Sequence, residues 1–330
     1  MWIFREEEIR RVVGLDGDAI AAVEKGFACL AEDGVTMPPI LRVDIPEHEG
    51  EVDVKTAVIH GESLFAIKIS SGFFANARLG LPTGNGMMIL VNAVNGRMEA
   101  VLMDNGYLTD VRTGAAGAVA ARYLAKQETD TVTVIGAGTQ ARFQVKALAQ
   151  VRNVKRLRVA GRDSSRVERF VREMEQELDI LVTAAVHAEE AVRGSDVVIT
   201  CTPASHPMIK TDWLEPGVHV TAMGSDAEHK QELEAQVYRR ADIWVCDSVD
   251  QCARLGELRS VREAGLLAEN AHVPDLGSLV LGRENGRVRE EQITVCDLTG
   301  TGVQDTAIAL LAYRRLREVG AGIQVEGAIQ

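Results

Sequence analysis

The chain has 330 residues, of which 46% are hydrophobic, so it can bury a sizeable core and is long enough for two domains of ordinary size. Its 48 acidic and 36 basic residues give a net charge of −12, which would repel a polyanionic partner such as nucleic acid. No apolar stretch approaches the roughly 20 residues that span a bilayer, and the first residues lack the layout of a signal peptide, so we expect a cytoplasmic protein.

The first hundred or so residues have the pattern of an α+β unit. A helix is predicted around residues 18–33, where apolar side chains recur at helical spacing. Short strands separated by Gly, Asn and Pro turns are predicted at 57–59, 66–70, 87–91 and 98–103. The dipeptide Asn95-Gly96, between the last two, is typical of a β-hairpin.

From about residue 130 the pattern changes to alternating strands and helices. Strands are predicted at 131–135, 156–160, 197–201, 218–223, 243–246 and 293–296. This alternation is typical of a doubly wound parallel sheet, the Rossmann arrangement. An alanine-rich helix over 112–125 would connect the two parts, and the amphipathic segment after Asp305 could pack back on the first.

We therefore expect an α/β protein with two domains. The smaller α+β domain would cover residues 1–125 and be completed by the C-terminal helix, at about 305–330. The dinucleotide-binding Rossmann domain would cover residues 126–304.

The run over residues 131–141 breaks an apolar strand into Gly-x-Gly-x-x-Ala and then into a helix. Gly136 permits the tight turn, Gly138 leaves room for a pyrophosphate, and Ala141 lets the helix pack closely on the strand. The helix N-terminus would then face the phosphates with unpaired N–H groups and a partial positive charge. The pattern predicts an NAD(P) site, and the alternative is a glycine turn in an ordinary βα unit.

Ligands of a doubly wound sheet bind beyond the C-terminal ends of the strands, so the residues at those ends are candidates for binding the cofactor. Besides the two glycines, they include Thr139, Gln140, Thr202, Met223 and Gly224.

The end of the second strand bears on the choice of cofactor. An NAD site usually ends this strand in an acid that holds the ribose hydroxyls, but here the strand ends in Gly161-Arg162. Arg162, Ser164 and Arg166 can form a pocket for a 2′-phosphate, which favours NADP(H) and leaves NAD(H) possible. Asp163 is a contrary observation, since an inward carboxylate would repel phosphate. In the alternative interpretation, Arg162 and Arg166 are solvated charges at a helix start.

Three cations of the first domain are candidates for binding a substrate carboxylate. Arg42 follows Pro38-Pro39, Lys68 lies inside an apolar run, and Arg112 opens the alanine-rich helix. A cation between apolar neighbours needs an anionic partner or an exposed strand face. Taken singly, each is more often a solvated charge, whereas together they would bind a carboxylate.

Asp226 follows the strand predicted at 218–223 and is the candidate for proton transfer. A carboxylate beside a nicotinamide could exchange a proton with an amine or polarise a water. The alternative is an N-cap for a helix through Glu232 to Val237. The five cysteines form no CxxC pair and the seven histidines show no ligand spacing, so neither a disulfide framework nor a metal site is predicted.

These residues, in this order, resemble the ornithine cyclodeaminase/mu-crystallin family over nearly the whole chain. The matching motifs are Met37-Pro38-Pro39 with Arg42, Ala66-Ile-Lys68, Leu108-Thr-Asp-Val-Arg112-Thr113 with Ala115-Ala116, Gly136-Ala-Gly138-x-Gln140-Ala141, Met223-Gly-Ser-Asp226 and Gly300-Thr-Gly-Val-Gln-Asp305. Residues 50–56, 71–74 and 104–110 further resemble the cyclodeaminase-like branch that is associated with ectoine and hydroxyectoine use.

The resemblance implies a homodimer in which the first domain and the last helix form the dimer interface and the substrate pocket. It makes Arg42, Lys68 and Arg112 the binders of the substrate carboxylate, with Lys68 also counted among the catalytic residues. It makes Asp226 the acid that serves the cyclodeaminases, and Arg162 matches the NADP-type position.

The leading hypothesis is therefore an NAD(P)H-dependent oxidoreductase that acts on an α-imino or α-amino acid, of the imine reductase or amino-acid dehydrogenase type. If the substrate carries a distal amine, the same pocket could instead run the cyclodeaminase reaction, a lyase with catalytic NAD. A third hypothesis is a mu-crystallin-like NADPH-binding protein, against which Asp226 argues.

Overall fold

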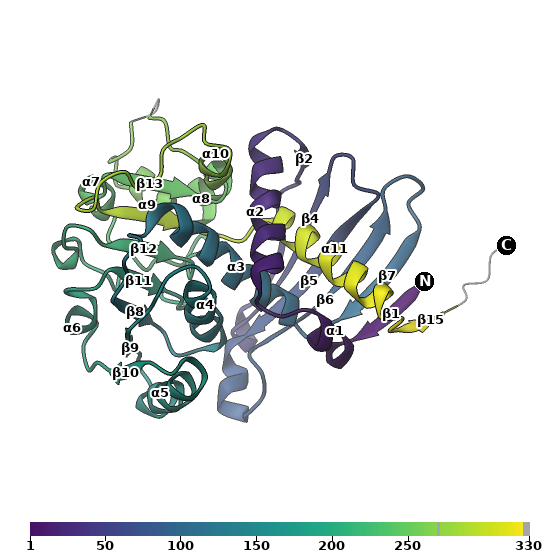
Figure 1. The fold of residues 1–330 in the computed structure, drawn as a ribbon, viewed down its shortest axis with the longest axis horizontal. Coiled ribbons are helices and arrows are strands. Elements are labelled where there is room, and N and C mark those ends of the chain that lie inside the picture. The colour runs from purple at the N-terminus through teal and green to yellow at the C-terminus, as the bar shows by residue number, and fades with distance from the viewer. Residues whose placement is uncertain (269–270, 326–330) are drawn as a thin grey trace. The chain divides into compact units, whose positions relative to one another are not determined.

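A computed structural model describes residues 1–268 and 271–325, without the side chain of Ala77. The chain divides into two compact units (Figure 1). Unit 1 contains residues 1–112 and the segment from residue 301 onward, and unit 2 contains residues 113–300. Both boundaries lie before those expected from the sequence, and the first is inside helix α3 (Tyr107–Leu124). No helix of the described residues is long and apolar enough to cross a membrane.

Unit 2 is built on a seven-stranded parallel sheet. Its strands are β8 (Thr131–Ile135), β9 (Arg156–Ala160), β10 (Leu181–Ala184), β11 (Val197–Thr200), β12 (His219–Ala222), β13 (Ile243–Cys246) and β14 (Thr294–Asp297). The strand order is β10-β9-β8-β11-β12-β14-β13. The order reverses between β8 and β11, which is the switch point where a doubly wound sheet binds its ligand.

The helices of unit 2 follow the strands in the sequence. They are α4 (Thr139–Ala149), α5 (Ser164–Leu178), α6 (Ala188–Val192), α7 (Val237–Arg240), α8 (Val249–Leu255), α9 (Glu257–Glu263) and α10 (Leu276–Val280), with the short 3-10 helix Thr211–Trp213. The predicted Rossmann arrangement is confirmed. The prediction of a helix through Glu232 is wrong, because α7 begins only at Val237.

Unit 1 contains a mixed eight-stranded sheet. Its strands are β1 (Trp2–Arg5), β2 (Val35–Thr36), β3 (Leu41–Ile45), β4 (Gly50–Ile59), β5 (Leu64–Phe73), β6 (Gly84–Asn92), β7 (Met98–Met103) and β15 (Ile323–Gln324). Among the described strands of this sheet, β1 and β7 pair in parallel and the other neighbours pair antiparallel. The hairpin predicted from Asn95-Gly96 is confirmed, since β6 pairs antiparallel with β7 and Gly96 has a φ of +72°.

The helices of unit 1 are α1 (Glu6–Val12), α2 (Gly17–Ala31) and α11 (Gly302–Glu318), with 3-10 helices at Pro46–His48 and Phe74–Leu79. Helix α11 packs on α2 and on strands β4 and β5, so it covers one face of the sheet (Figure 1). The expected return of the C-terminal helix to the first part of the chain is therefore observed. This helix ends at Glu318, and residues 326–330 of the expected range lie outside the described residues.

Strand β4 is much longer than the predicted segment 57–59. Its first half, from Gly50, contains charged residues, which made it resemble a loop. Asp53 and Lys55 are nevertheless buried. Burial of alternate charged residues on one strand indicates that this sheet face carries a polar site rather than only a hydrophobic core.

The buried side chain of Arg152 stabilises the C-terminal end of α3 within unit 2. Its guanidinium donates to the carbonyl oxygens of Ala121 and Arg122 at 2.8 Å each, and to Ala125 at 3.3 Å. The Nε atom donates to the carbonyl of Lys126 at 2.8 Å. Arg122 is among the last residues of α3, whose carbonyls a helix leaves without an internal partner, and a cation at this end also interacts favourably with the helix dipole.

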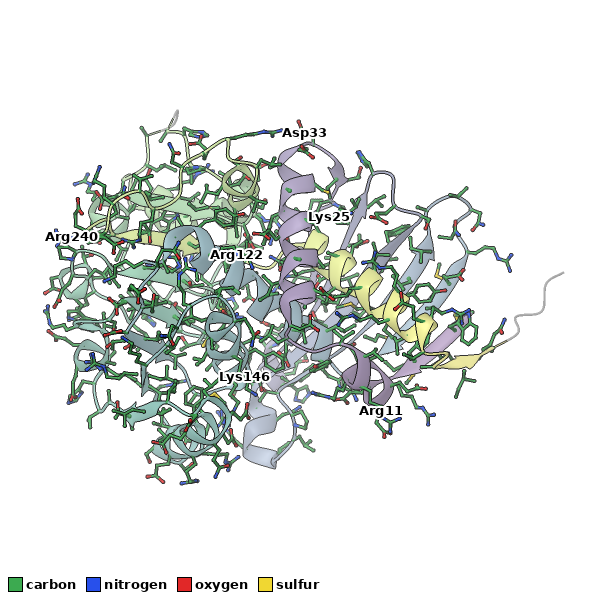
Figure 2. All side chains as sticks on the ribbon, in the orientation of Figure 1. Arg11, Lys25, Asp33, Arg122, Lys146 and Arg240 are labelled. Carbon is green, nitrogen blue, oxygen red and sulfur yellow. The ribbon has the colours of Figure 1, made fainter. Side chains whose placement is uncertain are left out.

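We predict that Arg152→Met lowers the free energy of unfolding by about 2–4 kcal/mol, because several buried carbonyls lose a charged donor. Urea unfolding would measure the change. The control is Arg240→Met, since Arg240 is exposed (Figure 2) and makes one long hydrogen bond of 3.5 Å, to the carbonyl of Leu214. Equal losses in the two variants would contradict the prediction.

Candidate functional site

The glycine turn after β8 has the geometry that a dinucleotide requires. Gly136 has a φ of +114°, and a Cβ there would lie 2.9 Å from the carbonyl oxygen of Cys201. Gly138 is the N-cap of α4, and no heavy atom lies within 4 Å of where its Cβ would be. No side chain caps the helix, and Thr139 at its start is exposed. A phosphate can therefore approach the free N–H groups of α4, so the turn fits the cofactor.

The end of β9 carries the predicted phosphate pocket. Arg162, Ser164 and Arg166 are all exposed there. Asp163, the contrary observation, is the N-cap of α5: its carboxylate accepts from the Arg166 backbone N–H at 3.1 Å and from the Ser165 hydroxyl at 2.7 Å. The Asp163 carboxylate thus accepts hydrogen bonds from the first turn of α5. Arg162 has no hydrogen bond or ion pair with other described residues.

The ends of β11 and β12 carry the other predicted cofactor residues. The backbone N–H groups of Thr202 and Gly224 both donate to one buried carboxylate, that of Glu232. Met223 lies next to Gly224 and is half-buried. Glu232 was not among the predicted site residues, because nothing in the local sequence shows that a glutamate in a predicted helix binds two strand ends.

Asp226 lies in the loop that follows β12. Its Oδ1 atom forms an ion pair of 2.7 Å with the ammonium of Lys230, whose side chain is buried, whereas about a third of the Asp226 side chain is exposed. The N-cap alternative fails, because residues 226–236 form no helix. The carboxylate is therefore held in place by a cation and remains partly open to a ligand.

In unit 1, two of the three predicted cations meet on a single carboxylate. Asp305, on α11, lies 3.1 Å from the ammonium of Lys68, on β5, and 2.9 Å from Nε of Arg112, on α3. All three side chains are buried. Arg112 also donates to Oε1 of Gln304 at 2.9 Å. Asp305 and Gln304 were missed as site residues, because an acid in the first turn of a helix is ordinary.

The sheet register places the third cation on the same face. Arg42 is directly opposite Asp53 on β4, and Lys55, two residues further along β4, is opposite Lys68. Side chains at alternate positions and at paired positions point to one side of a sheet. Arg42 also forms ion pairs with Glu51 and, at 3.5 Å, with Asp53.

Burial and neighbouring charge set the protonation of this cluster. Burial, followed by repulsion from Arg112, lowers the pKa of Lys68 to about 7, against the opposing attraction of Asp305. Burial would raise the pKa of Asp305, but Lys68 and Arg112 hold it below its ordinary value. Burial raises the pKa of the neighbouring Asp104 to about 6. Burial is thus the main reason that Lys68 loses its proton more easily than an exposed lysine, and repulsion from Arg112 adds to it.

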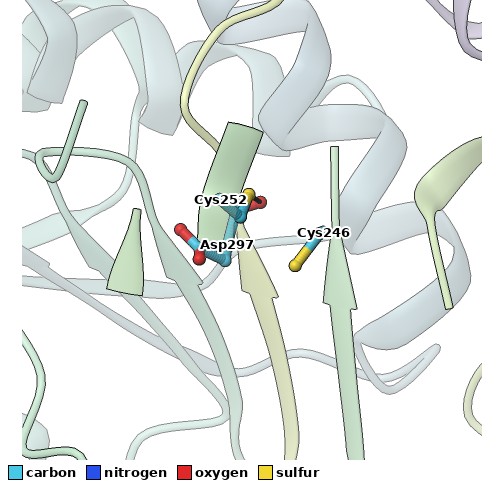
Figure 3. Close-up of side chains that lie close together, drawn as sticks. All are labelled: Cys246, Cys252 and Asp297. Carbon is cyan, nitrogen blue, oxygen red and sulfur yellow. Dashed lines mark hydrogen bonds between the residues drawn. The ribbon is translucent and has the colours of Figure 1, made fainter. Parts of the chain in front are cut away.

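One group of side chains among the described residues has the spacing of metal ligands. It consists of Cys246, Cys252 and Asp297 in unit 2, with ligand atoms within 4.8 Å of one another (Figure 3). Burial raises the pKa of both thiols and raises that of Asp297 to about 7. The Cys252 thiol donates to Asp247 at 3.3 Å. Since a metal needs thiolates, we interpret this group as part of the core.

Known proteins are similar to this chain over nearly its whole length. The ornithine cyclodeaminase/mu-crystallin family matches residues 3–320. The uncharacterized cyclodeaminase y4tK of Sinorhizobium fredii is 51% identical to this chain, and the alignment covers 98% of each protein.

Solved structures are also similar. The Δ1-pyrroline-2-carboxylate reductase of Thermococcus litoralis, in complex with NADH and L-proline, is 27% identical with a TM-score of 0.93, covering 98% of this chain and 100% of that one. An archaeal alanine dehydrogenase dimer with bound NAD is 31% identical with a TM-score of 0.90, covering 99% of each chain.

We predict that Asp305→Asn lowers the free energy of unfolding by about 3–5 kcal/mol in acid, because two buried cations lose their counter-charge. The variant should release the Lys68 proton at a lower pH than the wild type, whose Lys68 pKa is about 7. Just below neutrality, Lys68 is therefore protonated in the wild type but not in the variant. The decrease in the free energy of unfolding that Asp305→Asn causes should then become smaller as the pH rises through about 7.

Urea unfolding at about pH 5.5 and about pH 8 would measure this difference. The control is Asp18→Asn, since Asp18 pairs with Arg315 and its side chain is 74% exposed. An equal loss at both pH values, or one no larger than that of the control, would refute the assignment.

Proposed function

The chain belongs to the ornithine cyclodeaminase/mu-crystallin family, and from this premise we propose that it is an NAD(P)H-dependent oxidoreductase acting on an α-imino or α-amino acid. The observation that carries the proposal is the buried cluster of Lys68, Arg112 and Asp305, in a chain that also has the dinucleotide turn. A cationic cluster without a nucleotide turn would support only anion binding. The combination supports redox chemistry on a carboxylate-bearing substrate.

In this proposal unit 2 binds the cofactor. The α4 N-terminus holds the pyrophosphate, with Gly136 and Gly138 giving it room and Thr139 and Gln140 beside it. Thr202, Met223 and Gly224 hold the second half of the dinucleotide. The bound nicotinamide would give a hydride to the substrate α-carbon, or take one from it.

We propose that the 2′-phosphate of NADP(H) binds Arg162, Ser164 and Arg166. The exposed Arg162, without a protein partner among the described residues, supports this, as does the occupation of Asp163 by the start of α5. The similar solved structures contain NADH or NAD. NAD(H) is therefore the alternative for this chain.

Unit 1 would bind the substrate. Arg112, Arg42 and Lys68 would supply the positive charge that binds its carboxylate, although Arg42 already pairs with Glu51 and Asp53. With a pKa of about 7, Lys68 can also give or accept a proton near neutrality. Asp226, held by Lys230, would exchange the proton of the substrate nitrogen.

A cyclodeaminase is the second candidate, favoured by the presence of Asp226 and by the name of the relative y4tK. In that reaction the substrate's distal amine displaces ammonia, and the cofactor is regenerated. Incubation with ornithine would release ammonia without net change in NADH absorbance. A reductase would instead consume NADPH with Δ1-pyrroline-2-carboxylate, or with pyruvate and ammonium. Tight NADPH binding with no turnover in either assay would favour a mu-crystallin-like binding protein.

We also propose a homodimer with unit 1 as its interface. Exposed apolar side chains on unit 1 support this, namely Leu41, Val43, Leu79 and Leu81. The resemblance of residues 50–56 to the ectoine-associated branch stays a prediction. Thermal shift measurements with amino acids and keto acids, in the presence of NADPH, would identify the substrate class, because a ligand of the native state raises its stability.

We expect Asp226→Asn to reduce kcat by about 100-fold or more, since the amide keeps the size of the side chain but transfers no proton. Steady-state rates and the unfolding midpoint would be measured together. Glu228→Gln, in the same loop and exposed, is the matched control. A kcat close to that of the wild type would mean that water or the substrate supplies the proton.

Arg162→Ala should weaken NADPH binding by about 10- to 100-fold, the effect of losing a charge-assisted hydrogen bond, and should leave NADH nearly unchanged. Fluorescence titration with each nucleotide would show the difference. The control is Arg169→Ala, an exposed arginine further along α5. If both nucleotides weaken equally, or if the wild type prefers NADH, the NADP assignment is wrong.

A further inference from the structure

The carboxylate of Glu232 is the acceptor of four hydrogen bonds. Its Oε1 atom accepts from the backbone N–H of Thr202 at 2.7 Å and from the Thr202 hydroxyl at 2.8 Å. Its Oε2 atom accepts from the Thr200 hydroxyl at 2.7 Å and from the backbone N–H of Gly224 at 2.8 Å. The side chain is fully buried. Burial raises the pKa of Glu232, and the four donors offset part of that effect.

These four donors come from two neighbouring strand ends. Thr200 is the last residue of β11 and Thr202 follows it, whereas Gly224 is two residues beyond the end of β12. Strands β11 and β12 pair in parallel, so both ends lie on the ligand-binding edge of the sheet. One side chain therefore joins the loops that follow the two strands, beyond the backbone hydrogen bond from the Met223 N–H to the Thr200 carbonyl at 3.1 Å.

Gly224 is explained by the same contact. A Cβ on Gly224 would lie 2.2 Å from the Thr202 carbonyl oxygen and 2.5 Å from Cδ of Glu232. No other residue fits there without moving the carboxylate or the β11 loop. The requirement for glycine at this position thus comes from the Thr202 carbonyl and from the Glu232 carboxylate.

The backbone of Glu232 is itself fixed. Its N–H donates to Oε1 of the buried Glu257 at 2.7 Å, and that of Leu233 donates to Oε2 at 3.1 Å. Between Gly224 and Glu232, the Ser225 hydroxyl donates to the Lys230 carbonyl at 2.8 Å, and Lys230 pairs with Asp226. The loop that carries Asp226 is therefore closed at both ends by Glu232.

We propose that Glu232 is the positioning residue of the nicotinamide half of the cofactor site. It fixes the backbone of Thr202 and Gly224, and it anchors the loop that presents Asp226. This inference rests on the proposed function. The adenosine half of a doubly wound site is formed by the other strands, β8 and β9, so Glu232 should act on one half only.

The test is Glu232→Gln, in which an amide NH₂ replaces one acceptor oxygen and faces two donors. NADPH and NADH should bind about tenfold or more weakly to this variant, because one strand end loses its acceptor. The Kd of ADP, which has only the adenosine half, should stay within about twofold. Fluorescence titration and calorimetry on the full chain would give these constants, and circular dichroism would verify the fold.

Glu234→Gln is the matched control. Glu234 is two residues away and also accepts from a backbone N–H and a hydroxyl, those of Thr211, at 2.9 and 3.0 Å. It does not contact either strand end. If Glu232→Gln does not fold, Thr200→Val removes one of the four donors and should still weaken NADPH about two- to fivefold.

The outcomes separate the two proposals. Selective weakening of the dinucleotides by Glu232→Gln, with Glu234→Gln close to the wild type, supports the inference. Dinucleotide binding that is unchanged, or that weakens together with ADP, overturns it and leaves Glu232 a structural residue. If the wild type binds neither NADPH nor NADH, the proposed function fails, and this inference fails with it.

Discussion

The arrangement of unit 1 depends on the ion pairs that the buried carboxylate of Asp305 forms. It neutralises Lys68 and Arg112, two buried cations that would otherwise repel each other across β5 and α3. A buried ion costs several kcal/mol unless it is paired, so these cations can exist inside the unit only because α11 supplies their partner. The last long helix of the chain thereby completes an ion-pair cluster whose two cations lie in the first 112 residues of the chain.

Unit 2 also depends on a buried acid, but the partners of that acid are neutral hydrogen-bond donors and not cations. Glu232 is surrounded by neutral N–H and hydroxyl donors, so its carboxylate fixes the positions of loops and does not neutralise cations. Asp305 instead pairs with two cations, Lys68 and Arg112. One buried acid thus fixes the backbone of two strand ends, and the other balances buried positive charge.

Local sequence patterns predicted a helix, strand or turn correctly where a single property, such as hydrophobic periodicity or a glycine turn, indicated it. The Gly136 turn follows from backbone geometry, and β8 and β9 follow from short apolar runs, so both were found with their correct bounds. Strand β10 was missed because it has only four residues, of which Val182 alone is buried, so it is too short to show a periodic pattern. The first half of β4 was missed because its buried side chains include the charges of Asp53 and Lys55.

The sequence by itself determined the Rossmann arrangement, the nucleotide turn, and the residue types available for binding a carboxylate, because these depend on local periodicity and on single residues. Only the tertiary structure decided which charges meet. Asp305 is more than 190 residues from Arg112 along the chain and contacts it directly. The pairing of Asp226 with Lys230, in place of a helix cap, was also decided by packing. Ion pairs and buried hydrogen bonds depend on distances in space, and a linear pattern of residue types does not contain those distances.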